Sequence, residues 1–229
     1  MKLLVITREY PPYVLGGISY HLKNLYDQIA ELGHEITIVS GKCGSTDPDT
    51  SIKVRDDIDV RWVPFPTIQA HHLQFPLLAK QTIDSLDLSE FDAALTHTEY
   101  PFEIELPVIN KKHDCKQVSA KYSPPETVFK RTINKLIEPT RKVVDKRSVS
   151  VSDYIVYNSH LTKQEWENNY SFEKDSSVIY NGVDPTVFYP REVAMEEEYL
   201  LFVGDSARKG LSKVLSFAPS SPYPIYLVG

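Results

Sequence analysis

Residues 7–21, Thr7-Arg-Glu-Tyr-Pro-Pro-Tyr-Val-Leu-Gly-Gly-Ile-Ser-Tyr-His21, decide the fold of this chain. They follow a short apolar run at residues 2–6, whose β-branched bias favours a strand covered on both faces. Beyond them, apolar residues recur at the spacing of one helix face: Ile18, Leu22, Leu25, Ile29 and Leu32. Gly33 is the expected C-terminal cap of that helix, and residues 35–39 form the next expected strand.

Gly16 and Gly17 stand at the predicted start of this helix. Without a Cβ, the backbone can pass close to a ligand, and the unpaired N–H groups of a helix N-terminus attract anions. The pair can also form nothing more than a tight turn. Residues 2–39 therefore predict a Rossmann-like strand, glycine loop, helix and strand, with a right-handed crossover.

Polar and apolar segments alternate between residues 41 and 88. Glycine, proline and aspartate are typical of loops, and proline ends a regular strand. We expect a surface loop over 41–57, a strand over 59–63 that is ended by Pro64 and Pro66, and a helical stretch within 67–88.

The run Phe91-Asp-Ala-Ala-Leu-Thr-His97 predicts another strand, followed by a polar cluster. Ligands bind at the carboxyl ends of the strands in open α/β sheets. His97 and Glu99 therefore fall where a site is expected. The alternative for His97 is a loop histidine that makes a structural hydrogen bond.

Residues 107–123 contain a further expected strand, around 116–120. Residues 129–147 follow as a basic helical patch, with seven cations against two acids, or +5. Pro139 should kink or divide this helix. Such a basic face is either simply solvated, or it contacts anionic lipid or a charged acceptor.

The last third of the chain repeats the alternation of strand and helix. A strand over 153–159 precedes a helix that Ser159 or Thr162 caps. Residues 199–204 and 224–229 then predict two strands, with a loop and a helix between them. The charged segment 191–198 is typical of a linker.

Several segments together resemble the retaining nucleotide-sugar glycosyltransferases of family 4, which adopt the GT-B fold. The resemblance is carried by Glu-Tyr-Pro-Pro before Gly-Gly, by Leu32-Gly-His-Glu-Ile-Thr-Ile-Val39, and by Asn181-Gly-Val-Asp184 before Phe188 and Pro190. It implies an α/β protein with a GT-B-type, Rossmann-like N-terminal domain built on a parallel sheet. That acceptor-side domain would span 1–190, and an incomplete second Rossmann-like domain, which starts the donor-binding half, would span 199–229.

The resemblance implies transfer of a hexose, with retention, from a nucleotide diphosphate sugar to a hydroxyl acceptor such as a glycan, a lipid-linked molecule or a small molecule. His97 would be catalytic and reach the transferred sugar, and His21 and Glu99 would bind the acceptor. The donor would be bound by Gly16, Gly17, Gly204, Arg208 and Lys209. The family's arginine after the last strand glycine is replaced by Asp205, so Arg208 would have to substitute for it.

Composition excludes other classes of protein. The net charge of −6 argues against a nucleic-acid binder. No leader pattern and no run of about 18 apolar residues occurs, so we expect a cytoplasmic protein, with peripheral membrane contact through 129–147. Cys43 and Cys115 are expected to be reduced thiols. We expect no metal and no cofactor, because no Asp-x-Asp element stands at the end of a predicted strand.

Three alternatives remain open on the sequence. A module that binds an acceptor without catalysis would also fit an incomplete donor domain. A nucleotide-sugar epimerase would need catalytic carboxylates that the sequence does not identify. A nicotinamide-dependent dehydrogenase would need a Gly-x-Gly-x-x-Gly loop in place of Pro11-Pro12 and Gly16-Gly17.

Overall fold

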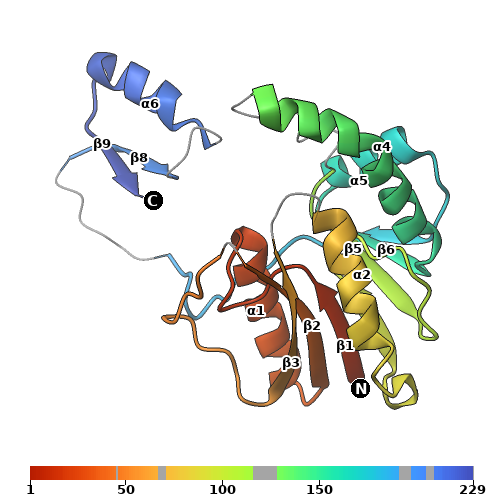
Figure 1. The fold of residues 1–229 in the computed structure, drawn as a ribbon. Coiled ribbons are helices and arrows are strands. Elements are labelled where there is room, and N and C mark those ends of the chain that lie inside the picture. The colour runs from red at the N-terminus through yellow and green to blue at the C-terminus, as the bar shows by residue number, and fades with distance from the viewer. Residues whose placement is uncertain (45, 67–70, 116–127, 191–196, 205–208, 229) are drawn as a thin grey trace. The chain divides into compact units, whose positions relative to one another are not determined.

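The structure is a computed structural model, and it describes residues 1–44, 46–66, 71–115, 128–190, 197–204 and 209–228. Figure 1 shows the fold and labels the helices and strands for which there is room. The chain divides into two compact units, unit 1 at Met1–Asp184 and unit 2 at Pro185–Gly229. The predicted strand over 116–120 and the candidate site residue Arg208 both lie outside the described residues.

Unit 1 is an α/β structure built on one sheet. Its seven strands run in the order β3-β2-β1-β4-β5-β6-β7, and every neighbouring pair is parallel. The predicted α/β class with a parallel sheet is therefore confirmed. The described elements are β1 (Lys2–Thr7), α1 (Gly17–Glu31), β2 (Glu35–Cys43), β3 (Ile58–Phe65), α2 (His71–Ile83), a 3₁₀ turn (Leu88–Glu90), β4 (Ala93–Thr96), β5 (Val108–Lys112), α4 (Val128–Ser150), β6 (Tyr154–Tyr157), α5 (His160–Tyr170) and β7 (Ser176–Val178).

The side chains of β1 alternate between two hydrophobic clusters, one on each face of the sheet. Leu4 and Ile6 pack in the cluster that contains residues of α2. Val5 packs in the cluster that contains Leu22 and Tyr26 of α1. All of these residues are buried, as a parallel sheet covered by helices on both faces requires. The apolar run at the start of the sequence is thus the centre of the core.

Two predicted helix ends agree with the structure. Gly33, just after α1, has φ +87°, a left-handed conformation that favours glycine. Ser159 precedes α5, and its Oγ accepts a hydrogen bond from the Thr162 N–H at 3.1 Å. Of the two cap candidates, Ser159 is therefore the one that caps α5.

The predicted loop over 41–57 begins too early, because β2 continues to Cys43. The predicted end of the next strand at Pro64 is also wrong, since β3 runs to Phe65 and pairs Pro64 with Lys42. Proline is tolerated there because β3 is the edge strand, so one side of its ladder needs no partner.

Within residues 107–123, where a strand was expected, β5 covers Val108–Lys112, and residues 116–120 lie outside the described part of the chain. β5 follows Pro107 directly and pairs with both β4 and β6. Of the two effects expected of Pro139, a kink or a division of the basic helix, the division is wrong, because α4 continues through it. Pro139 is exposed, so water can solvate the carbonyl that proline leaves unpaired.

Unit 2 is a small strand, helix and strand arrangement. Its described elements are β8 (Leu200–Val203), α6 (Leu211–Phe217), a 3₁₀ turn (Ala218–Ser220) and β9 (Ile225–Val228). β8 and β9 form a parallel pair. This agrees with the predicted repeat of strand, loop, helix and strand near the end of the sequence.

Candidate functional site

A group of imidazole and amine side chains gathers at the carboxyl edge of the sheet in unit 1. His97 follows β4 directly, Lys111 belongs to β5 and His113 follows it, and His21 stands on the first turns of α1. The His97 N–H donates to the Ile6 carbonyl at 2.8 Å, which holds this loop against β1. We call His21, His97, Lys111 and His113 the histidine cluster.

His97 is buried and lies between two partners. Its Nε2 is 2.5 Å from the Tyr26 hydroxyl, and its Nδ1 is 3.1 Å from His113 Nε2. Burial keeps the pKa of Tyr26 well above its usual value, so its hydroxyl stays protonated, and His97 Nε2 is the described acceptor within reach of that proton. Burial also lowers the pKa of His97, so its ring is neutral; with Nε2 accepting from Tyr26, the ring proton lies on Nδ1 and is donated to His113.

His21 and Lys111 form a second pair beside this chain of hydrogen bonds. Lys111 Nζ lies 3.2 Å from His21 Nε2, and the rings of His21 and His113 make an edge contact with centroids 5.6 Å apart. Burial and the nearby lysine lower the pKa of His21 to about 4. Lys111 can only donate, so the neutral His21 ring accepts at Nε2 and carries its proton on Nδ1.

The diglycine loop at the start of α1 is uncovered. Gly17 is exposed, and a Cβ added to Gly16 or Gly17 would meet no described atom within 4 Å. Beneath the loop, buried Glu9 accepts a hydrogen bond from Ser19 Oγ at 2.6 Å and lies 3.4 Å from the Arg8 guanidinium. The pair therefore faces open space at a helix N-terminus, as an approach to a ligand requires.

A further buried polar cluster lies between β5, α4 and α5. Lys112 is buried with its Nζ 4.2 Å from the ring centroid of Trp166. Asp145 is buried too, and it accepts a hydrogen bond from the Tyr170 hydroxyl. Burial and the charge of Glu99 raise the pKa of Asp145 to about 7. The charge of Glu99 therefore raises the pKa of Asp145 and also acts to raise that of His113.

In unit 2, Gly204 and Lys209 lie close together. The Gly204 N–H donates to the Val228 carbonyl at 2.7 Å, and Gly204 has φ +149°. A Cβ added to Gly204 would stand 2.9 Å from Lys209 Cβ. Glycine is therefore required where the aliphatic stem of the lysine crosses the end of β8.

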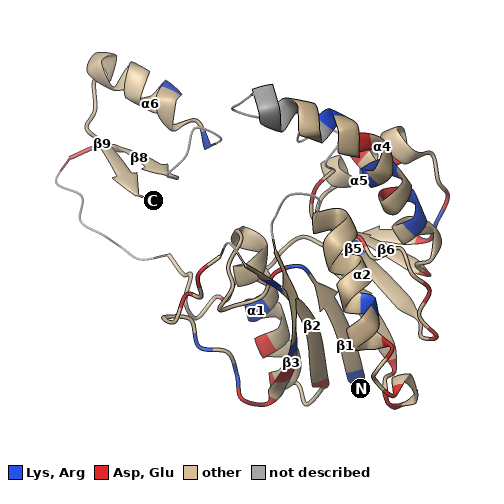
Figure 2. Ribbon diagram, viewed as in Figure 1, with Lys and Arg blue, Asp and Glu red and all other residues tan. Residues whose placement is uncertain are grey.

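Figure 2 marks lysines and arginines along α4. Among those whose burial the structure describes, Arg141 is half-buried and the others are exposed: Lys135, Lys142, Lys146 and Arg147. Leu136 and Val143 on the same helix are 74% and 66% exposed. Two of the cations are paired with acids, Lys142 with Glu138 at 3.0 Å and Arg147 with Glu103 at 2.6 Å. The helix thus combines exposed apolar side chains with exposed positive charge.

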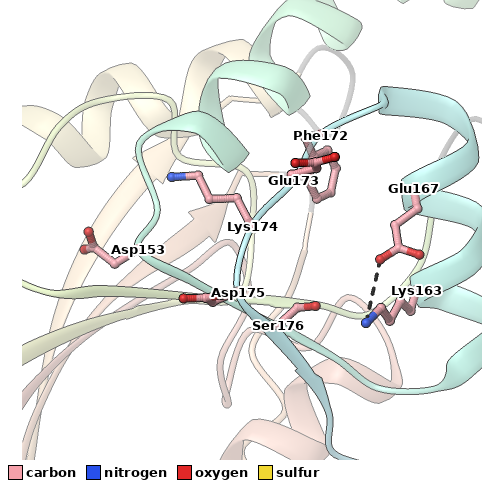
Figure 3. A pocket seen from close by; sticks show the side chains of 8 residues that line it. All are labelled: Asp153, Lys163, Glu167, Phe172, Glu173, Lys174, Asp175 and Ser176. Atoms are coloured by element: carbon pink, nitrogen blue, oxygen red, sulfur yellow. Dashed lines mark ion pairs between the residues drawn. The ribbon is translucent and has the colours of Figure 1, made fainter.

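A pocket of about 630 Å³ lies at the opposite, amino edge of β6 and β7 (Figure 3). Its two lysines already have partners: Lys163 pairs with Glu167 at 3.7 Å, and Lys174 Nζ donates to the Ser152 carbonyl at 2.7 Å. The pocket shares no residue with the histidine cluster. Its lining residues are Asp153, Lys163, Glu167, Phe172, Glu173, Lys174, Asp175 and Ser176.

The described residues contain no group of three or more histidine, cysteine or acidic side chains arranged to hold a metal ion. Over the same residues, no helix has the length and apolar character needed to cross a membrane. Cys43 and Cys115 are both buried and form no disulfide bond.

Sequence reasoning identified His97 and His21 but missed three of the residues that join them. Tyr26 lies on the buried face of α1, where a tyrosine resembles any other core residue. Lys111 and His113 were missed because no strand was predicted at Val108–Lys112. Had Val108–Lys112 been assigned as the strand, His113 would have stood at its carboxyl end, where ligand-binding residues are expected.

Comparison with known proteins identifies the family of this chain. A profile described as Glycosyltransferase Family 4 matches residues 15–187, which is most of the chain. The whole chain also superimposes on sucrose-phosphate synthase from Thermosynechococcus elongatus with a TM-score of 0.75 and 15% identity, covering 62% of that chain. The protein belongs to glycosyltransferase family 4, and its fold is GT-B-like.

Two curated relatives are also glycosyltransferases or glycogen synthases by name, and they do not establish a substrate for this chain. An uncharacterized glycosyltransferase of Methanocaldococcus jannaschii, MJ1607, is 23% identical over 241 aligned residues, covering 96% of this chain and 59% of that protein. A glycogen synthase of Mycobacterium tuberculosis is 38% identical over 50 residues, which is 22% of this chain and 12% of that protein. The chain therefore spans less than two thirds of the length of these relatives.

Proposed function

We propose that this chain takes part in transferring a hexose, with retention, from a nucleotide diphosphate sugar to a hydroxyl acceptor. The observation that carries the proposal is the family 4 match over residues 15–187, together with an uncovered diglycine at the start of α1 beside the histidine cluster. Residues 1–190 are the acceptor-side domain in this proposal, and 199–229 begin the donor-binding half.

In the proposed reaction, the bond between the anomeric carbon and the diphosphate oxygen breaks, and negative charge develops on the leaving diphosphate. The acceptor hydroxyl forms the new bond and loses its proton. Fixed donors that face developing charge usually supply the largest part of such catalysis. The N–H groups at Gly16 and Gly17, with Lys209 and Arg208 from unit 2, have this role, and the chemistry needs no metal.

His97 is the proposed contact to the transferred sugar, with His21 and Glu99 on the acceptor side. The hydrogen bond from Tyr26 supports a positioning role for that side chain, because it fixes the proton of His97 on Nδ1. His113 Nε2 accepts a hydrogen bond from His97 Nδ1–H at 3.1 Å. His97 is therefore held in one tautomer and one orientation.

The test is to incubate the chain with a panel of nucleotide sugars and acceptors, and to measure release of the nucleoside diphosphate. We expect Gly17→Trp to lower turnover about a hundredfold, because the new side chain occupies the open space that the donor needs. Lys209→Ala is expected to weaken donor use as well. Leu32→Trp, at the exposed far end of α1, is the matched control. Full turnover in Gly17→Trp contradicts the role of the loop.

A non-catalytic acceptor-binding module is the second candidate, because the proposed acceptor contacts His21 and Glu99 both lie in unit 1. Calorimetry on this chain distinguishes the two functions. Acceptor binding without any binding of a nucleotide sugar favours the module, whereas binding of both favours the enzyme.

Peripheral contact with anionic lipid through α4 is a further part of the proposal. It is supported by exposed Leu136 and Val143 beside exposed lysines. We expect the chain to co-sediment with vesicles that contain phosphatidylglycerol, and Leu136→Glu to reduce the bound fraction. Equal binding to neutral vesicles, or none to either, contradicts this part alone.

A further inference from the structure

Three half-buried side chains of the histidine cluster come from different elements and carry N–H donors. Lys111 Nζ lies 3.2 Å from His21 Nε2, and the His21 and His113 rings are 5.6 Å apart. His97, beneath them, is buried and engaged by Tyr26 and His113. Lys111, His21 and His113 are therefore the less buried members of the cluster.

The positive charge of Lys111 is not balanced within the described part of the chain. Its hydrogen-bond partner there is an imidazole, and no described carboxylate forms an ion pair with it. Glu9, the buried acid near α1, is already engaged by Ser19 and Arg8. A half-buried charge without a counter-charge is costly, and a bound anion removes that cost.

The hydrogen-bond pattern leaves donors for such an anion. His21 accepts from Lys111 at Nε2, and His113 accepts from His97 at Nε2, so each neutral ring keeps an N–H at Nδ1. No described residue accepts from either of these Nδ1–H groups. Together with the remaining protons of Lys111, they form a donor set suited to the several acceptor oxygens of one phosphate group.

Acidic groups near the three side chains are few. Glu99 is the acid whose charge reaches His113, and its effect is smaller than those of burial, His21 and Lys111. For Lys111, burial is the influence that dominates. The electrostatic balance at this edge of the sheet therefore favours a negatively charged ligand.

We propose that Lys111, His21 and His113 form a binding site for a phosphate group, and that the acceptor carries this group. The inference rests on the proposed function, because the acceptor is the second substrate of that reaction. A phosphate has two possible sources in that reaction, a phosphorylated acceptor and the donor diphosphate. Two of the three groups, Lys111 and His113, lie at β5, which β4 separates from β1 and its diglycine loop, whereas His21 lies on α1 beside that loop. The position of these two groups favours the acceptor as the source.

The test follows the imidazole resonances of His21 and His113 by NMR while a ligand is added. Inorganic phosphate and glucose 6-phosphate are expected to shift both resonances saturably, whereas glucose is not. Bound phosphate should also raise the pKa of each ring from the values near 4 and 3 that burial and Lys111 impose. Equal effects of glucose and glucose 6-phosphate, or no effect of either, overturn the proposal.

Two lysine variants add a matched comparison. Lys111→Gln should weaken glucose 6-phosphate binding about tenfold or more, because it removes the charge that the phosphate pairs with. Lys163→Gln, in the pocket at the opposite edge, should leave the affinity unchanged. Unchanged affinity in Lys111→Gln overturns the site. If that variant does not fold, the titration of the unaltered chain decides alone.

A nucleoside diphosphate distinguishes the two sources. If UDP shifts the His21 and His113 resonances and glucose 6-phosphate does not, the site belongs to the donor and the acceptor assignment is overturned. Phosphate binding without any sugar transfer leaves this site standing and contradicts only the proposed enzyme. Transfer to unphosphorylated acceptors, with no phosphate binding, contradicts only this inference.

Discussion

The same local pattern, a strand, a loop, a helix and a parallel strand, begins unit 1 and makes up unit 2, with opposite results for burial. In unit 1, Leu4 and Val5 of β1 are fully buried. In unit 2, Leu201 of β8 is 57% exposed and Leu227 of β9 is 48% exposed. An apolar strand is therefore buried only when other elements cover both of its faces.

The difference lies in the neighbours of each strand. β1 lies between β2 and β4, and separate hydrophobic clusters cover its two faces. β8 pairs with β9 within a two-stranded sheet. Two similar sequence patterns thus contribute very different amounts to the stability of the units that contain them.

The largest expected effect comes from shortening a leucine in each strand. Leu4→Ala should lower the free energy of unfolding of unit 1 by about 3 kcal/mol, because it leaves a cavity in a closed core. Leu201→Ala should change stability by no more than about 0.5 kcal/mol, since its side chain is already largely in water. Urea unfolding of both variants measures the contrast, and equal losses would show that it is wrong.

Glycine substitutions sharpen the contrast within unit 1 itself. A Cβ added to Gly41 would lie 2.3 Å from the Arg8 carbonyl oxygen and 2.7 Å from Phe65 Cε1. Gly41→Ala should therefore cost about 2 kcal/mol, because β2 lies between β1 and β3 and cannot move away from either.

Gly17→Ala is the matched variant, since a Cβ there meets no described atom within 4 Å. We expect no loss of stability, and a gain of up to about 1 kcal/mol from the higher helix propensity of alanine. Thermal unfolding of the two variants decides. A stability loss in Gly17→Ala as large as that in Gly41→Ala would mean that the diglycine loop is packed after all.

A pH dependence is expected from a buried carboxyl of unit 1. The pKa of Asp145 is raised to about 7, so the folded state keeps this proton where the unfolded chain has lost it. Stability from this group should therefore fall as pH rises from about 4 to about 7, by about 1.4 kcal/mol for each pH unit by which the pKa is raised. Urea midpoints at several pH values should lose this slope in Asp145→Asn and keep it in Asp59→Asn, an exposed acid on β3. A slope that survives in Asp145→Asn assigns it to another group.

How far the sequence predicts the structure depends on the range of the interactions involved. The helix that starts at Gly17, its end at Gly33 and the cap at Ser159 were all predictable, because each depends on residues within a few positions. The prediction that Pro64 ends the strand was wrong because proline is tolerated in an edge strand, and β3 is one. The residues next to Pro64 in the sequence do not indicate that β3 lies at the edge of the sheet.

The candidate site divides in the same way. Placing His97 after a strand was enough to predict it at the carboxyl edge of the sheet. Its partners are Tyr26, on a helix face, and His113, just after β5, at separations of 71 and 16 residues. No local pattern links side chains that far apart.

By itself, the sequence determined the alternation of strands and helices in unit 1, several of their ends and the family to which they belong, because periodicity and capping act between near neighbours. The tertiary structure alone decided that Tyr26, His97 and His113 join in one chain of hydrogen bonds and that Lys111 stands beside His21. It also decided that β1 is buried while β8 is exposed. The physical reason is that burial and side-chain contact depend on which elements cover and adjoin a strand, and that is fixed only when the whole sheet has formed.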